Sequence, residues 1–169
     1  MSETAATVIL GIDPGLNITG YGLLRASGNQ VSLLEAGVVR SRRNDSLEQR
    51  LLQLYEGVND IIETFAPDVM ALEELYSHYE RPQTAILMGH ARGVLCLAAG
   101  KAEVPVMHYR ATQIKSVMTG NGRAPKSQIQ MAVTNLLNLD AIPDPPDVAD
   151  ALAIALCHHF LNRNPLHSK

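Results

Sequence analysis

The stretch that decides the fold is residues 8–15, VILGIDPG, an apolar run that ends in Asp13 and a Pro-Gly turn. An apolar run of this length, bounded by turn residues, predicts a strand that is buried on both faces. Residues 16–24, LNITGYGLL, follow at once and predict a second strand, so that the two form a hairpin. Asp13 then lies at the end of a central strand, where an ionised carboxylate is costly unless it is paired or coordinated. We interpret it either as a turn residue or as a metal or phosphate ligand.

The rest of the chain alternates between strand and helix patterns. Further strands are expected at residues 30–40, 68–76 and 104–108. Helices are expected from Asp45 or Ser46 to about Phe65, at residues 83–101, 111–118 and 147–160, and after Pro125. Residues 83–101 are apolar on nearly all sides, which predicts a buried helix packed on the sheet or on another subunit. This order predicts an α/β fold with a five-stranded mixed sheet flanked by helices.

Length and composition set further bounds. The 169 residues predict a single domain over 1–169, with a polar C-terminal tail at about 162–169. The formal net charge of −3 gives no sign of a nucleic-acid partner, so any such partner must be inferred from where the charges lie. Cys96 and Cys157 fall in apolar helical patterns, which favours reduced thiols and a cytoplasmic location. We expect neither a signal peptide nor a membrane span.

Acidic residues stand at the ends of three apolar segments. Glu73 and Glu74 are adjacent on a predicted strand, so their side chains face opposite ways. Asp147 and Asp150 are three apart and lie on one face of the last helix. Asp147 has an alternative role as a helix-capping residue, whereas Asp150 directly precedes a strongly apolar run.

If these acids converge with Asp13, cations must offset their repulsion. Clusters of carboxylate oxygens suit Mg²⁺ or Mn²⁺ rather than zinc. Two such ions are the usual device for the attack of water on a phosphodiester. The acids therefore predict a metal-dependent nuclease site.

Basic residues gather in one acid-free segment between Glu103 and Asp140. Its members are Arg110, Lys115, Arg123 and Lys126. Lys126 falls in the first turn of a predicted helix, where the helix dipole disfavours a cation unless an anion binds there too. Lys115, taken alone, is more often simply a solvated residue on a helix surface. Tyr76 is either a tyrosine at the edge of the core or a stacking platform for an unpaired base.

Taken together, these residues resemble one family, the RuvC-type Holliday-junction resolvases of the ribonuclease-H-like superfamily. The resemblance covers nearly the whole chain. It runs through GIDPG at 11–15, Glu73, GHARG at 89–93, QIK at 113–115, KSQ at 126–128, DVAD at 147–150 and the apolar run that follows. It implies a ribonuclease-H-like fold and a structure-selective endodeoxyribonuclease that resolves four-way junctions by paired symmetric nicks in recombination and repair. It also implies two Mg²⁺ ions per active site (or Mn²⁺), a homodimer and a branch-migration helicase complex as partner.

The resemblance also assigns roles to single residues. Asp13, Glu73, Asp147 and Asp150 match the metal-binding acids of the family and, with Lys126, form the implied catalytic set. Glu73 is preferred over Glu74 because Tyr76 then stands three residues after the acid, where the family has an aromatic residue. The residues implied to contact DNA are Tyr76, Arg81, Lys115, Arg123 and Lys126. The helix around residues 91–93 is implied to lie near the dimer interface.

Two other functions remain open from the sequence. One is a non-catalytic junction-binding scaffold of the same fold. The other is an actin-like ATPase or kinase lobe, because DPG at 13–15 followed by Thr19-Gly20 resembles a nucleotide-binding hairpin. Such folds normally need two lobes, and this chain has the length of one. Metal-dependent cutting of a synthetic junction would separate the three possibilities.

Overall fold

The computed structural model describes residues 6–75 and 81–163. The strands are β1 (Thr7–Asp13), β2 (Ile18–Ser27), β3 (Gln30–Arg40), β4 (Val69–Glu73) and β5 (Val106–Tyr109). The helices are α1 (Leu47–Phe65), α2 (Pro82–Lys101), α3 (Ala111–Thr119), α4 (Lys126–Leu136) and α5 (Pro146–Asn162). These elements follow the predicted order, and α1 begins after Ser46 in a capping box with Gln49.

The strands form one mixed sheet in the order β3-β2-β1-β4-β5. The first three strands are an antiparallel meander, and β4 and β5 join by parallel pairing to β1 and β4 in turn. Parallel neighbours need crossover connections, which α1 and α2 supply. The predicted five-stranded mixed sheet is confirmed.

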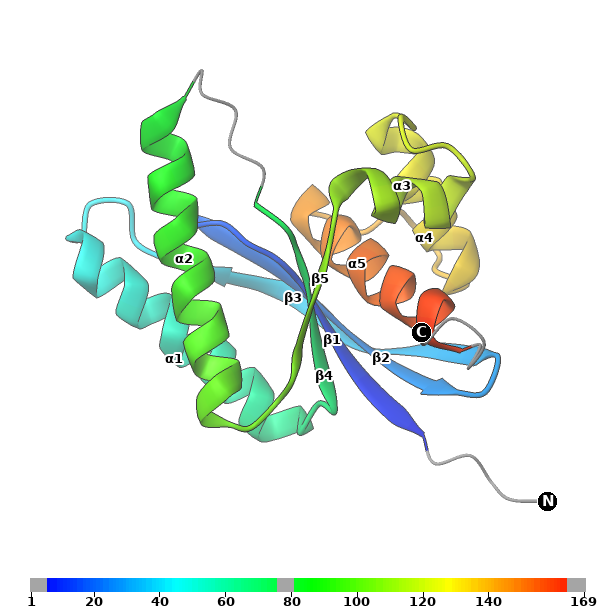
Figure 1. The fold of residues 1–169 in the computed structure, drawn as a ribbon, viewed down its shortest axis with the longest axis horizontal. Coiled ribbons are helices and arrows are strands. Elements are labelled where there is room, and N and C mark those ends of the chain that lie inside the picture. Colours follow the sequence, from blue (N-terminus) through cyan, green and yellow to red (C-terminus); the bar gives the residue numbers. More distant parts are fainter. Residues whose placement is uncertain (1–5, 76–80, 164–169) are drawn as a thin grey trace.

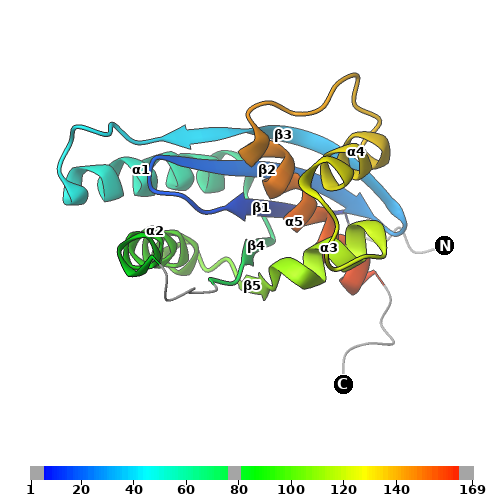
Figure 2. The same ribbon diagram turned by 90° about the horizontal axis from the view of Figure 1, so that it is seen from above.

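Helices cover both faces of this sheet (Figure 1). One face packs on α1 and α2 through residues such as Leu10, Ile12 and Leu72. The other packs on α3, α4 and α5 through residues such as Ile9 and Ala71. Viewed from above, β1 runs through the middle of the molecule between the two helix layers (Figure 2). Because side chains alternate along β1, successive residues of this strand pack into the two hydrophobic cores on opposite faces of the sheet.

Helix α5 is the most deeply packed helix. Every residue from Val148 to His159 except Asp150 is buried. Glycines on the facing strands allow this close approach, because a Cβ at Gly11 would lie 2.2 Å from the carbonyl oxygen of Ala151. The prediction that α5 is a core helix holds, and Asp150 interrupts its buried surface.

Two predicted elements differ from the structure. The strand expected at 68–76 ends at Glu73, and Tyr76 lies outside the described residues. Helix α2 is not buried on all sides: it buries Ala91, Leu95, Ala98 and Ala99, whereas Ile86 and Leu97 are 60% and 56% exposed. An all-round apolar pattern predicts burial only where another surface covers each side of the helix.

Within residues 6–75 and 81–163, every helix is too short or too polar to cross a lipid bilayer. The five strands form one sheet with helices on both sides of it, and that the whole chain forms a single domain stays a prediction.

Candidate active site

Two of the predicted acids end neighbouring strands. Asp13 is the last residue of β1 and Glu73 the last of β4. The two strands run parallel in a register that pairs Ile12 with Leu72, so their carboxyl ends stop side by side. Side chains alternate along a strand, and Ile9 and Val69 belong to the core under α5. Asp13 and Glu73 therefore leave the sheet on the face that α5 covers.

The other two acids come from the start of α5. Asp147 lies in its first turn and Asp150 one turn further on. A Cβ at Gly20 would lie 2.1 Å from the carbonyl oxygen of Asp147, so this glycine lets the helix start close to β2, opposite Asp13 in the β1–β2 register. The N-cap is Pro145 and makes no side-chain cap hydrogen bond. The capping alternative for Asp147 is therefore wrong.

The four carboxylates share one electrostatic field. Burial raises the pKa of Asp13 to about 7, helped by the negative charges of Asp150, Glu73 and Asp147 and opposed by Lys126. Burial also raises the pKa of Glu73, with Asp150 adding to the rise and Lys115 opposing it. Each effect has the sign expected when like charges gather in a poorly hydrated place. The structure thus brings together the acids that the sequence singled out.

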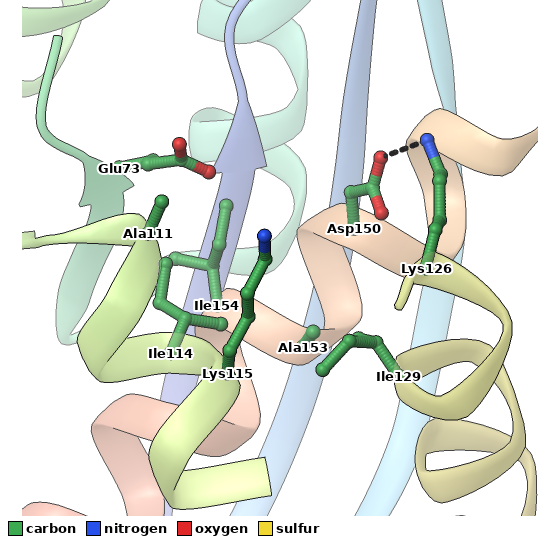
Figure 3. A pocket seen from close by; sticks show the side chains of 9 residues that line it. All are labelled: Glu73, Ala111, Ile114, Lys115, Lys126, Ile129, Asp150, Ala153 and Ile154. Carbon is green, nitrogen blue, oxygen red and sulfur yellow. Dashed lines mark hydrogen bonds and ion pairs between the residues drawn. The ribbon is translucent and has the colours of Figure 1, made fainter. Parts of the chain in front are cut away.

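Two lysines stand among these acids (Figure 3). Nζ of Lys126, in the first turn of α4, lies 2.7 Å from Oδ2 of Asp150. Lys115 projects from α3 toward Glu73, and both lysines line the same cavity of about 250 Å³. Asp150 and Glu73 line this cavity too. A cavity that holds cations beside anions can accept a phosphate next to the carboxylates.

The choice between Glu73 and Glu74 follows from their contacts. Glu73 lines the cavity, whereas Oε2 of Glu74 lies 3.4 Å from Nε of Arg110 in an exposed ion pair. The backbone carbonyl of Glu73 accepts a hydrogen bond from Nη1 of Arg92, whose Nη2 lies 3.1 Å from Nδ1 of His108. Arg92 therefore holds the end of β4 in place from α2.

A second positioning residue is Thr19, which is fully buried. Its hydroxyl donates to the carbonyl of Gly15 at 2.6 Å and accepts from the amide of Gly15 at 3.2 Å. These bonds close the turn that follows Asp13. From the sequence, Thr19 was named only in the nucleotide-binding-hairpin alternative and residues 91–93 only near the implied dimer interface, so a role of Thr19 or Arg92 in positioning the acids was not predicted.

Two other predicted DNA contacts, Arg81 and Arg123, do not line this cavity. Arg81 is the N-cap residue of α2 and Arg123 lies in the loop before α4, and both are exposed. The loop at 119–123 is a hydrogen-bonded turn in which the side chain of Asn121 accepts from the amide of Arg123 at 2.9 Å. Tyr76 lies outside the described residues, so its role stays a prediction.

The donor set fits a hard divalent cation in kind, because the donors are carboxylates and a nearby positive charge would offset both the burial of Asp13 and the repulsion from its neighbours, which together raise the pKa of this carboxyl. In the parts of the chain that the structure describes, no three Asp, Glu, His or Cys side chains yet surround a common point at which a metal could bind. Lys126 already occupies one oxygen of Asp150.

A five-stranded sheet of this order, with acids where β1 and β4 end and α5 begins, defines a nuclease of the ribonuclease-H-like fold. The model of one family, described as crossover junction endodeoxyribonuclease RuvC, matches residues 9–158. The chain belongs to the RuvC family, and it is a nuclease and hydrolase that acts on Holliday junctions in DNA recombination and repair. The family uses a divalent metal.

Comparisons with individual proteins support the assignment to this family. A crossover junction endodeoxyribonuclease RuvC from Rhodopirellula baltica is 59% identical over 162 residues, covering 96% of this chain and 91% of the relative. Thermus thermophilus RuvC in complex with a Holliday junction substrate superposes with a TM-score of 0.88 at 34% identity, covering 93% and 95% of the two chains. The yeast mitochondrial Holliday junction resolvase, at 15% identity and a TM-score of 0.60 over 89% and 78%, shares the fold. The predicted family, fold class and enzyme class are confirmed.

Proposed function

We propose that the chain resolves four-way junctions by paired, symmetric nicks, and that Asp13, Glu73, Asp147 and Asp150 hold the metal ions that make each cut possible. The observation that carries this proposal is the convergence of carboxylates from β1, β4 and α5 at one edge of the sheet, where burial, together with the neighbouring negative charges, raises the pKa of Asp13 to about 7. Such a cluster is costly unless cations offset it.

The metal is Mg²⁺, or Mn²⁺ in its place, with two ions per site. Carboxylate oxygens are the ligands that these hard ions prefer. When bound, the ions supply Lewis acidity at the attacking and leaving oxygens of the phosphodiester. Asp13 and Glu73 have little freedom to move, because β1 and β4 are central strands, and Arg92 fixes the end of β4.

The lysines act on the substrate phosphate. Lys115 and Lys126 line the cavity beside Glu73 and Asp150, so a phosphate entering it meets two ammonium groups next to the carboxylates. Lys126 exchanges its contact with Asp150 for a phosphate oxygen, which frees that carboxylate for the metal. Lys126 thus serves the catalytic set as well as DNA binding.

The remaining DNA contacts lie further out. Arg81 and Arg123 are exposed near the start of α2 and of α4, where they reach the backbone of the junction arms. Tyr76 stacks on a base next to the cut, which is a role inferred from the family resemblance alone. The Thermus relative is described as bound to a Holliday junction substrate, which supports this class of DNA as the ligand.

The working form is a homodimer. A junction presents two nearly equivalent strands, and a twofold dimer offers one site to each. Ile86 and Leu97 of α2 are exposed, and this apolar surface is the proposed contact between the subunits. We further propose that the chain is a single domain and that it acts in the cytoplasm. Its partner there would be a branch-migration helicase complex.

A matched pair of variants tests the assignment. Glu73→Gln should lower the Mg²⁺-dependent cutting rate of a synthetic four-way junction at least roughly 100-fold while binding survives. Glu74→Gln, which loses only the exposed pair with Arg110, should cut at the wild-type rate. Equal rates for wild type and Glu73→Gln would contradict the proposal, and so would equal loss in both variants.

A further inference from the structure

A second cavity borders the acids from the opposite helix layer. It has a volume of about 500 Å³ and is lined by the turn at residues 15–18, by Arg43 and Arg50, by the first half of α2 and by Asp147. The cavity with Lys115 and Lys126 is walled by α3, α4 and α5, whereas this one is walled by α1 and α2. The acid cluster therefore lies between two separate cavities.

The second cavity also carries positive charge. Among its described lining residues, Asp147 is the only acid, against two arginines. Arg43 is exposed in the loop between β3 and α1. Within the part of the chain that the structure describes, ion pairs join Glu74 to Arg110 and Asp150 to Lys126, so no carboxylate neutralises Arg43 or Arg50.

Arg50 is held in a fixed position by the turn after β1. Its Nη2 donates to the side-chain oxygen of Asn17, and its Nε donates to the hydroxyl of Ser41 at 3.3 Å. Ser41 in turn donates from its hydroxyl to the carbonyl of Leu16 and from its amide to the carbonyl of Asn17. This network ties Arg50 to the same turn that follows Asp13. A guanidinium held in this way loses little entropy when it binds an anion.

We propose that Arg43 and Arg50 form a second phosphate-binding site, which holds a phosphate of the cleaved strand on the far side of the acids from Lys115 and Lys126. The inference rests on the proposed nuclease function and adds residues to it. A strand that crosses four carboxylates is repelled along its path, and cations on both sides of the cluster offset that repulsion. Guanidinium groups suit this task because their fork matches phosphate oxygens.

Salt dependence gives the first test. Arg43→Gln should weaken binding of a four-way junction by roughly 3–10-fold relative to wild type and reduce the slope of log affinity against log salt by about 1. Arg42→Gln is the matched control, because Arg42 is exposed in the same loop but does not line the cavity. Its affinity should stay within about 2-fold of wild type. Equal weakening by both variants would show only a general charge effect and would overturn the inference.

A chemical variant of the substrate locates the phosphate. For this test, a series of synthetic junctions is prepared, each with one uncharged methylphosphonate at a different position of the cleaved strand. The affinity of the protein for each junction is then measured. Wild type should lose affinity at one position beside the scissile phosphate, and Arg43→Gln should no longer respond at that position. If Arg43→Gln responds like wild type at every position, the second site is wrong. Failure of the nuclease proposal looks different, because wild type itself would then leave the junction uncut.

Discussion

The ammonium of Lys126 lies 2.7 Å from Oδ2 of Asp150, although the two residues are 24 positions apart and belong to different helices. The lysine is 57% exposed and the aspartate 27%, so the pair adds little to stability. Its importance lies in where it is: it keeps one carboxylate of the acid cluster partly neutralised and places a cation at the mouth of the cavity.

Removing this cation should slow cutting more than it weakens binding. Lys126→Met is expected to reduce the single-turnover cutting rate on the order of 100-fold, because one donor to the reacting phosphate is lost. Junction affinity should fall by less than about 10-fold, as expected for the loss of one phosphate contact. Lys101→Met is the control, since Lys101 lies at the end of α2 over the ring of Tyr55. A Lys126→Met protein that cuts at the wild-type rate would remove Lys126 from the catalytic set.

Replacing Asp13 should abolish cutting but raise the stability of the metal-free protein. Asp13→Asn removes the carboxylate whose pKa is raised to about 7, so cutting should be lost while junction binding is retained. In metal-free buffer at pH 8 the variant should melt roughly 2–8 °C above wild type, because a buried charge and its repulsion are gone. Asp60→Asn, on the exposed face of α1, should change neither property. A lower melting temperature for Asp13→Asn would contradict the repulsion inferred for the cluster.

The same carboxyl predicts how stability depends on pH without metal. The pKa of Asp13 is about 7 in the folded chain, against an ordinary value of 3.8 for an aspartate carboxyl. The folded state therefore holds the proton more tightly, and its contribution is full below pH 4 and is lost as pH rises through 7. Denaturant unfolding of the metal-free protein from pH 4 to pH 8 should show this loss, reduced in Asp13→Asn. Added Mg²⁺ should restore stability at pH 8, and a failure to do so would contradict metal binding at the cluster.

Gly20 should matter because α5 begins against it. A Cβ there would lie 2.1 Å from the carbonyl oxygen of Asp147, so Gly20→Ala must displace the start of the helix. We expect a loss of about 1–3 kcal/mol in unfolding free energy and slower cutting by the folded fraction. Gly100→Ala is the control, because a Cβ at Gly100 meets open space. Wild-type activity in Gly20→Ala would show that the placement of Asp147 tolerates movement.

Much of the sheet could be predicted from local patterns. The apolar run that ends in Asp13 is a central strand, and the period of two along the next buried strand sets Glu73 and Glu74 on opposite faces, although the preference for Glu73 rested on the family resemblance. Both inferences depend only on residues that are adjacent in the sequence, because the side chains of a strand alternate between its two faces.

Contacts between distant segments could not be predicted in the same way. The hydrogen bond from Arg92 to the carbonyl of Glu73, and the network that joins Arg50 to Asn17, depend on how helices lie against the sheet. Which surface covers the outer side of α2, the sheet or another subunit, could not be predicted for a related reason. An apolar pattern indicates which side chains avoid water, and Ile86 and Leu97 remain exposed because no part of the described chain reaches them.

The burial of α5, interrupted at Asp150, predicts slow hydrogen exchange next to the acids. Backbone amides from Val148 to His159 lie in a helix whose side chains are all buried except that of Asp150, so hydrogen exchange there requires cooperative opening of the core. Asp150 lies within this segment and Asp147 immediately precedes it, so we expect both acids to keep their positions until the core opens. A destabilised variant should lose its cutting activity and its slow-exchanging amides in the same transition.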